Sequence, residues 1–293
     1  MADGMNPEAR ARLLIDKQLE QAGWAVQDRS QIDLVNQAGV AVRETIMDRG
    51  AGRADYLLYL NKRVVGVIEA KPSGTTLSEV EWQSRRYAQG LTKEQKLGAV
   101  LVHDELPFIF EASGTETHYT NLFDPEPRSR HIFNFPKPET LARVLRASET
   151  HPESPTWRGR VSTIPNTDGY DLRPASRRAV EAVEKSLQNN QHSRSLVQMA
   201  TGAGKTRMAV TESYRLLKFG GFNRVLFLVD RNNLGDQARG EFRNFDTPDD
   251  GRKFTDLYNV DKLTSSGMVD SSAVVISTIQ RVWSVLKGQT VTE

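Results

Sequence analysis

The sequence has no cysteine among its 293 residues, which excludes disulfide bonds and metal sites built on thiolates. It also has no apolar run of about 18 residues, so no segment is expected to span a membrane. The first residues, Met1 to Gly4, lack the basic and then apolar profile of a secretory signal peptide. Together these absences predict a cytoplasmic protein without a membrane partner.

A marked excess of one charge is absent too. The 39 lysines and arginines nearly balance the 37 aspartates and glutamates, for a net charge of +2. This balance permits nucleic acid as a partner but is not evidence for one. Hydrophobic residues (38%) and charged residues (26%) occur in the proportions of an ordinary globular protein, and the length allows one to three domains.

The residue pattern predicts a first unit at 1–148, a linker at 149–168 and a second unit at 169–293. The linker is predicted because its residues include three prolines and few aliphatic side chains. The first unit is expected to hold a mixed sheet. Its expected elements are a helix at 6–23, strands at 40–45, 54–60, 64–70 and 98–102, a helix near 78–87, and a strand and a helix within 131–147.

Helices and strands alternate in the second unit. The expected elements are helices at 174–187, 205–218 and 233–245, and strands at 194–198, 224–229 and 273–277. Such alternation predicts a parallel sheet with helical crossovers. The chain as a whole is therefore expected to be of the α/β class.

Two acidic residues and a lysine stand at strand ends in the first unit. Glu69 and Lys71 are two residues apart, so their side chains leave the same face of one strand. If residues 61–63 form a three-residue hairpin loop, Leu60 pairs with Val64, and Asp55 then pairs with Glu69.

Paired carboxylates repel each other and favour a shared divalent cation, and oxygen ligands suit Mg²⁺. Asp55 and Glu69 are therefore candidate metal ligands, with Lys71 placed to orient a water or steady developing charge. The same spacing also suits a Glu–Lys ion pair on a solvated strand end. Glu44 and Glu20 are either additional acids near the metal or members of surface ion pairs.

A glycine-rich turn marks the second unit. It runs Met199-Ala200-Thr201-Gly202-Ala203-Gly204-Lys205-Thr206, between a predicted strand and a predicted helix. Backbone amides of Thr201, Gly202, Ala203 and Gly204 would face the phosphates of a nucleotide, and the helix N-terminus would add positive charge. Lys205 would reach the β- and γ-phosphates, and the hydroxyl of Thr206 would hold Mg²⁺. The bland alternative is a turn without a ligand.

The pattern of Asp55, Glu69 and Lys71 resembles the PD-(D/E)xK nuclease fold. Gln83 and Tyr87 lie four apart on the following predicted helix, and this Q-x-x-x-Y spacing resembles the RecB-like branch of those nucleases. That resemblance implies that both residues lie near the DNA backbone and the catalytic site.

A wider resemblance covers nearly the whole chain. The blocks that carry it are Arg43-Glu44, Ala54-Asp55-Tyr56, residues 66–71, Phe133-Asn134-Phe135, residues 138–141 and residues 169–174. Together they are similar to the R subunit of type I restriction–modification enzymes. This implies an endonuclease and ATP-dependent translocase of double-stranded DNA, which uses Mg²⁺ and ATP and assembles with methyltransferase and specificity subunits.

The turn in the form A-T-G-x-G-K-T resembles superfamily 2 helicases and translocases, with Met199 where the general phosphate-loop pattern has glycine. Residues 225–238 and 274–280 resemble the DNA-contact motifs that follow it. The resemblance implies part of a RecA-like lobe. The metal-holding Asp-Glu of such motors is absent downstream, and Asp104-Glu105 is expected to be a loop feature in the first unit.

The family often has a glutamine that reads adenine after the Leu-Arg-Pro segment, and Ser176 stands here instead. Tyr170 or Arg173 is left as a candidate to pack on the base. Two other interpretations stay open. The chain is either a helicase fragment whose first domain only binds DNA or a partner, or a truncated, non-enzymatic product that docks on partners or binds nucleotide without turnover.

Overall fold

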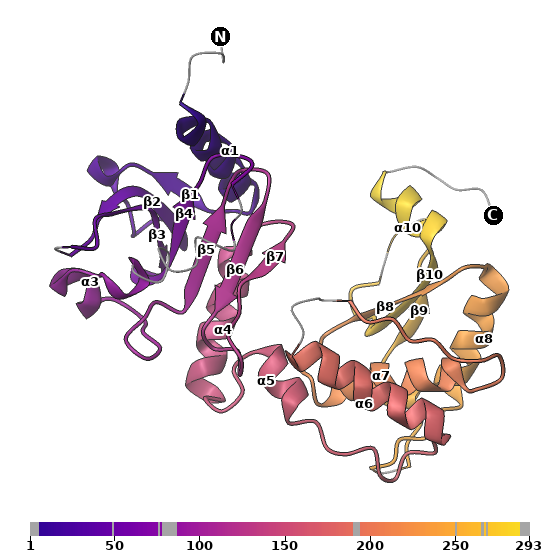
Figure 1. The fold of residues 1–293 in the computed structure, drawn as a ribbon. Coiled ribbons are helices and arrows are strands. Elements are labelled where there is room, and N and C mark those ends of the chain that lie inside the picture. The colour runs from indigo at the N-terminus through magenta and orange to yellow at the C-terminus, as the bar shows by residue number, and fades with distance from the viewer. Residues whose placement is uncertain are drawn as a thin grey trace. The chain divides into compact units, whose positions relative to one another are not determined.

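The computed structural model describes residues 6–48, 50–75, 77, 87–189, 194–249, 251–264, 267 and 269–287. The chain forms two compact units, residues 1–156 and 157–293 (Figure 1). No helix in the described ranges is long and apolar enough to cross a bilayer.

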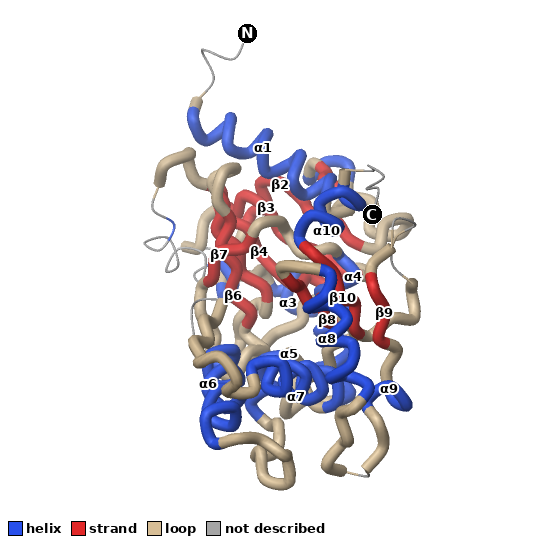
Figure 2. Tube along the Cα trace, turned by 90° about the vertical axis from the view of Figure 1, so that its right-hand side faces the viewer, coloured by secondary structure: helices blue, strands red, loops and turns tan. Residues whose placement is uncertain are grey.

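The first unit is built on a seven-stranded mixed sheet in the order β1-β2-β3-β4-β5-β6-β7 (Figures 1 and 2). Its strands are β1 (Ala25–Gln27), β2 (Gly39–Ile46), β3 (Arg53–Leu60), β4 (Arg63–Ala70), β5 (Phe108–Ala112), β6 (Thr117–Asn121) and β7 (Arg130–Ile132). The β1–β2 and β4–β5 pairs are parallel, and the other pairs are antiparallel. A mixed sheet is what the sequence predicts, but β1, β5 and β6 are not among the predicted strands.

The first unit also contains α1 (Pro7–Gln21), the 3₁₀ helix η1 (Arg29–Gln31), α3 (Lys93–Leu97) and α4 (Pro138–Thr150), of which α1 and α4 pack on the sheet. The side chain of Asn6 accepts a hydrogen bond from the Glu8 amide, which caps the first turn of α1. Ile15 of α1 and Leu141 of α4 are buried in one apolar cluster with Tyr56 of β3. A second cluster includes Leu57, the next residue along β3, whose side chain points to the opposite face of the sheet.

The β3–β4 hairpin differs from the predicted one at its tip. Asn61 and Lys62, both with positive φ (46° and 70°), form a two-residue turn, so Leu60 pairs with Arg63 rather than Val64. A bulge at Leu58/Tyr59 then shifts the register by one residue. Beyond it, Tyr56 pairs with Ile68, which is the predicted register.

The predicted strand at 98–102 is wrong. Those residues make only isolated bridges, Val64 to Ala99 and Val102 to Glu105. The neighbour of β4 is instead β5, and Gly66 allows this close approach because a Cβ there would lie 2.5 Å from the Phe108 carbonyl oxygen. Asp104 lies in the tight turn between Val102 and Glu105, as expected for a loop feature.

The predicted linker at 149–168 contains structure that the sequence analysis does not anticipate. Helix α5 (Trp157–Ser162) lies within it and packs against α6 (Pro174–Asn189) of the second unit. The fully buried guanidinium of Arg215 donates to the backbone carbonyls of Pro165 (2.6 Å) and Asn166 (3.1 Å). Pro165 therefore belongs to a stretch anchored by buried hydrogen bonds rather than to a solvated tether.

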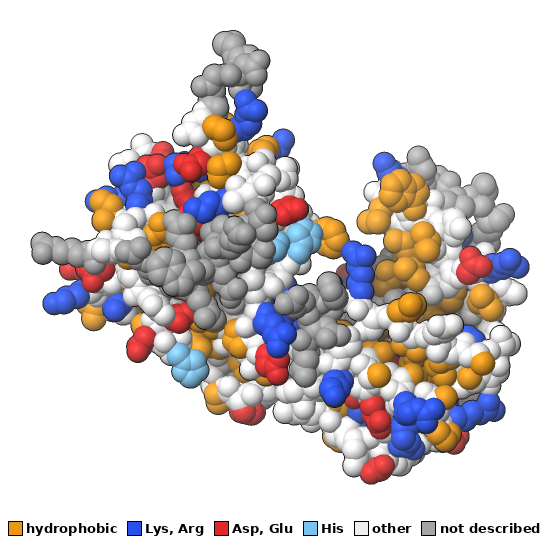
Figure 3. Space-filling model, in the orientation of Figure 1, with side chains coloured by type: hydrophobic (Ala, Val, Ile, Leu, Met, Phe, Trp, Pro, Cys, Tyr) orange, Lys and Arg blue, Asp and Glu red, His pale blue; other side chains and the backbone are white. Residues whose placement is uncertain are grey.

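The second unit continues with α7 (Lys205–Lys218), β8 (Val225–Val229), α8 (Asn232–Arg243), α9 (Phe254–Leu257), β9 (Val260–Lys262), β10 (Val274–Thr278) and α10 (Ile279–Leu286). The strands form a parallel sheet in the order β8-β10-β9, which agrees with the predicted alternation. Hydrophobic side chains, including Leu226, Ile279 and Trp283, are at least half exposed, and Figure 3 shows such side chains gathered over α10 and the strands beside it.

The predicted strand at 194–198 is also wrong. Residues 194–200 have no regular secondary structure, and the side chain of Leu196 is 95% exposed. A strand is stable only where its amides and carbonyls pair with neighbouring strands, and no described strand lies against this segment. The glycine-rich turn therefore follows an extended segment rather than a sheet strand.

Candidate active site and phosphate loop

The carboxylates of Asp55 and Glu69 meet at the end of the β3–β4 hairpin. Asp55 Oδ2 accepts a hydrogen bond from the backbone amide of Ala70 at 2.8 Å, which ties β3 to the residue after Glu69. Only 9% of the Asp55 side chain and 4% of the Glu69 side chain are exposed. The antiparallel register beyond the bulge therefore brings together the two acids that the sequence singles out.

Lys71 completes this group of residues. Its Nζ lies 2.7 Å from Glu69 Oε1 in a half-buried ion pair. The other oxygen, Glu69 Oε2, is buried and has no hydrogen-bond partner among the described residues. Burial raises the pKa of Glu69 to about 7, and the nearby charge of Asp55 adds to that increase while Lys71 opposes it.

The donor set fits a hard divalent cation, since a buried carboxylate oxygen without a partner lies beside a second carboxylate. The set contains two acids rather than three. Within the described ranges, no group of three or more His, Cys, Asp or Glu side chains is arranged to hold a metal ion. An ion held here would therefore take several of its ligands from water or substrate.

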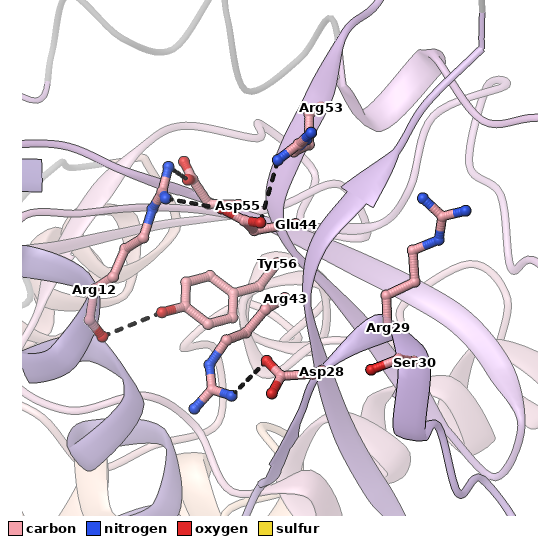
Figure 4. Close-up of a pocket in the computed structure, with 9 residues that line it drawn as sticks. All are labelled: Arg12, Asp28, Arg29, Ser30, Arg43, Glu44, Arg53, Asp55 and Tyr56. Atoms are coloured by element: carbon pink, nitrogen blue, oxygen red, sulfur yellow. Dashed lines mark hydrogen bonds and ion pairs between the residues drawn. The ribbon is translucent and has the colours of Figure 1, made fainter. Parts of the chain in front are cut away.

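Four arginines line a cavity that Asp55 borders. The cavity has a volume of about 660 Å³ and is lined by Arg12, Asp28, Arg29, Ser30, Arg43, Glu44, Arg53, Asp55 and Tyr56 (Figure 4). Arg12 Nη2 lies 2.6 Å from Asp55 Oδ1, and its Nη1 lies 3.1 Å from Glu44 Oε1. Glu44 also pairs with Arg53 at 3.1 Å, and its backbone has a positive φ of 48°. Of the two extra acids, Glu44 therefore borders the site through ion pairs, while Glu20 is exposed and does not line this cavity.

Only Tyr87 of the Q-x-x-x-Y pair is described by the structure. Gln83 lies outside the described residues. Tyr87 is 8% exposed and belongs to the apolar cluster of Leu57 and Val67, on the sheet face to which Asp55 and Glu69 also point. Tyr87 therefore packs within the core on this face of the sheet. Its place near the DNA backbone and the catalytic site stays a prediction.

Sequence reasoning missed Arg12 and the network beside it. The Tyr56 hydroxyl donates to Asp16 Oδ1 at 2.8 Å, and Arg43 donates to both oxygens of Asp16. Arg12 and Asp16 are four residues apart on α1, so they share one helix face. That spacing is the signal available in the sequence, but it does not show which strand the face covers.

The glycine-rich turn at residues 199–206 has the backbone that its glycines predict. Gly202 and Gly204 have φ values of 77° and 89°, which side chains rarely allow, and α7 begins directly after Gly204. Lys205 Nζ donates to the carbonyls of Ala200 (3.0 Å) and Met199 (3.4 Å). The ammonium of Lys205 thus donates to carbonyls of its own turn. It would have to leave them to contact a phosphate.

Ser176 and Arg173 both hold the backbone of the glycine-rich turn, and a role of Arg173 at a base stays a prediction. The hydroxyl of Ser176 donates to the Ala203 carbonyl at 3.1 Å, and Arg173 donates to the Gly202 carbonyl. The ring of Tyr170 is 8% exposed in the core of the second unit, with the guanidinium of Arg215 over it. The expectation that Tyr170 could pack on a base is wrong because its ring is buried in that core.

Two family profiles match the chain. The profile described as "Type I restriction enzyme EcoKI endonuclease subunit second domain" matches residues 34–123, which hold β2 to β6 and the two acids. The profile described as "Type III restriction enzyme, res subunit" matches residues 169–291, which include the glycine-rich turn.

Curated relatives match across both units. The EcoKI endonuclease subunit of Escherichia coli K12 is 28% identical over 93% of this chain. The chain is a homologue of type I restriction endonuclease subunits. The EcoAI subunit of Escherichia coli is 28% identical over 77% of the chain, and the SauCOLORF180P subunit of Staphylococcus aureus COL is 24% identical over 98%. The chain spans only 26%, 27% and 31% of the length of these three relatives.

A solved structure of a fragment of a putative HsdR subunit of a type I restriction enzyme from Vibrio vulnificus YJ016 also matches. It is 21% identical, and the match covers 97% of this chain and 48% of the fragment with a TM-score of 0.36. The family assignment rests on the sequence matches. They support a restriction endonuclease subunit with a helicase-like second domain.

Proposed function

We propose that residues 1–148 are a Mg²⁺-dependent endonuclease domain of the PD-(D/E)xK type, which cuts double-stranded DNA. The observation that carries this proposal is the convergence of Asp55, Glu69 and Lys71, with one carboxylate oxygen of Glu69 buried and without a partner among the described residues. The match of residues 34–123 to a domain of a type I endonuclease subunit supports it.

In this proposal Asp55 and Glu69 hold the metal. Bound there, Mg²⁺ would polarise the phosphodiester and lower the pKa of a coordinated water. The amide of Ala70 fixes the Asp55 carboxylate in place, and Lys71 holds Glu69 while its ammonium supplies positive charge beside the scissile group. The burial of both acids strengthens these interactions because little water screens them.

We further propose that residues 169–293 are part of the first RecA-like lobe of a superfamily 2 motor. Residues 201–206 would bind the phosphates of ATP, with Thr206 as a ligand of its Mg²⁺. ATP hydrolysis and DNA translocation would belong to the longer protein, in a cytoplasmic complex with methyltransferase and specificity subunits.

One observation favours the alternative in which the first domain only binds DNA or a partner. Three metal-ligating side chains do not converge anywhere in the described part of the chain. Direct metal binding separates the two functions, because a DNA-binding module has no need of an ion held by Asp55 and Glu69.

The test is cleavage of plasmid DNA by the chain with Mg²⁺. Asp55→Asn and Lys71→Gln should each lower the rate by about 100-fold or more, because each removes a charge at the reacting group. Glu149→Gln is the matched control, since Glu149 makes an exposed ion pair with Arg63 on the same unit. Cleavage by Asp55→Asn at the rate of the control would show that the site is wrongly assigned.

A further inference from the structure

Arg12 stands where a cation is expected. Its guanidinium lies between two carboxylates, 2.6 Å from Asp55 Oδ1 and 3.1 Å from Glu44 Oε1 (Figure 4). Arg12 comes from α1, whereas both acids come from neighbouring strands, β2 and β3. A side chain from a separate element thus supplies the positive charge that these acids require.

This contact places a positive charge where a metal bound through Oδ1 of Asp55 would lie. Oδ2 is engaged by the Ala70 amide at 2.8 Å, and Oδ1 is engaged by Arg12. A divalent ion bound through Oδ1 would lie within a few ångströms of the guanidinium, where like charges repel strongly in a partly buried site. The hydrogen bond to Ala70 is part of the fold, so Arg12 is the partner that can leave.

Release of Arg12 is physically feasible. Its side chain is 36% exposed and borders the 660 Å³ cavity, so water can replace the carboxylates around it. Its Nε is buried without a hydrogen-bond partner among the described residues, which means that the present position does not satisfy the whole guanidinium. Glu44 keeps Arg53 as a partner when Arg12 moves away.

We propose that Arg12 is a positioning residue that competes with the catalytic metal for the carboxylate of Asp55. It holds Asp55 in the ligand position and excludes weakly bound cations, and metal entry displaces it. This inference rests on the proposed nuclease function and adds a regulation of metal loading at the same site.

The experiment is calorimetric titration of Mn²⁺ into the chain, compared with the Arg12→Gln and Arg53→Gln variants. Arg12→Gln should bind Mn²⁺ about tenfold more tightly, the size expected for one lost charge-assisted contact. Arg53→Gln removes a like charge from the same cavity but does not touch Asp55, so its affinity should stay within about twofold of the wild type. Arg12→Lys keeps a single ammonium and should bind Mn²⁺ more tightly than the wild type, by less than tenfold. This variant supplies the test if Arg12→Gln fails to fold.

Each result is decisive. Equal or weaker binding by Arg12→Gln overturns the competition and leaves the proposed nuclease site standing. Equal tightening in Arg12→Gln and Arg53→Gln also overturns it, because the effect is then one of general charge. If neither the wild type nor any variant binds Mn²⁺, while thermal melting shows folded protein, the proposed metal site itself is wrong and the inference falls with it.

Discussion

Single residues show where the fold accepts an electrostatic cost. Both carboxylate oxygens of Glu212 on α7 are buried without a hydrogen-bond partner among the described residues. Burial raises the pKa of Glu212 to about 8, and the neighbouring Glu184 adds to that increase while Arg215 opposes it. Arg215 is already committed to Glu184, with contacts of 2.6 and 3.0 Å. Glu212 is therefore held in its neutral form near pH 7.

The pH dependence of stability follows from this proton. Since the ordinary value is 4.5, the folded chain binds the proton of Glu212 more tightly than the unfolded chain does. The stability that this bound proton gives the folded chain is complete below about pH 4.5 and is lost as the pH rises toward 8. Glu212→Gln, which is neutral at every pH, should therefore raise the melting temperature of the second unit by a few degrees at pH 8 and change it little at pH 5.

Thermal melting followed by circular dichroism at both pH values checks this expectation. The exposed Asp230, whose side chain is 79% accessible, supplies the control substitution Asp230→Asn. A gain in stability of the same size at pH 5 and pH 8 would contradict the assigned proton.

At the scale of elements, the β3–β4 hairpin sets the geometry of the candidate site, and its register could be predicted only in part. Counting residues from an assumed three-residue loop gives the correct pairing of Tyr56 with Ile68. It gives the wrong pairing at Leu60, because the real turn is one residue shorter and the bulge takes up the difference. No residue type in this segment marks the bulge, since Val65 fits a regular strand as well as an irregular one.

Elements that depend on distant partners were the least predictable. The strand at 194–198 was inferred from local apolar residues, but a strand forms only where its backbone groups find a neighbouring strand. Arg12 was missed for the same reason, since its contact with Asp55 joins residues that are 43 positions apart in the sequence. The acid pair could be found because a hairpin makes its contacts nearly local.

The turn offers a stability test of the hairpin. Lys62 has a φ of 70°, which costs a residue with a side chain about 1 kcal/mol, so Lys62→Gly should stabilise the first unit by about that amount.

Gly66→Ala tests the contact between β4 and β5. It should destabilise the first unit by about 1–3 kcal/mol, because the new Cβ would meet the Phe108 carbonyl at 2.5 Å. Urea unfolding of both variants measures the two changes, and a stabilised Gly66→Ala would contradict the β4–β5 pairing.

At the scale of the whole molecule, the two candidate sites lie in different units. Residues 1–156 contain the acid pair and residues 157–293 contain the glycine-rich turn. In the first unit, basic and acidic side chains are interspersed on the face shown in Figure 3. Nuclease activity and nucleotide binding should therefore respond to different substitutions.

Nucleotide binding tests this division. ATP with Mg²⁺ should raise the melting temperature of the second unit in the wild type, and Lys205→Ala should abolish most of that shift because a phosphate contact is lost. Lys218→Ala, on the same helix but paired with Asp249, should retain it. Neither variant should change the cleavage of DNA by the first unit. A full ATP shift in Lys205→Ala would show that the nucleotide does not use this loop.

The bulge beside Tyr59 has one more consequence. A three-residue turn followed by a regular strand contains as many residues between Leu58 and Gly66 as the observed two-residue turn followed by a bulge. Both arrangements therefore give the same pairing of Tyr56 with Ile68. The bulge thus offsets the shorter turn within a few residues. The spacing of the two carboxylates therefore does not depend on the length of the turn alone.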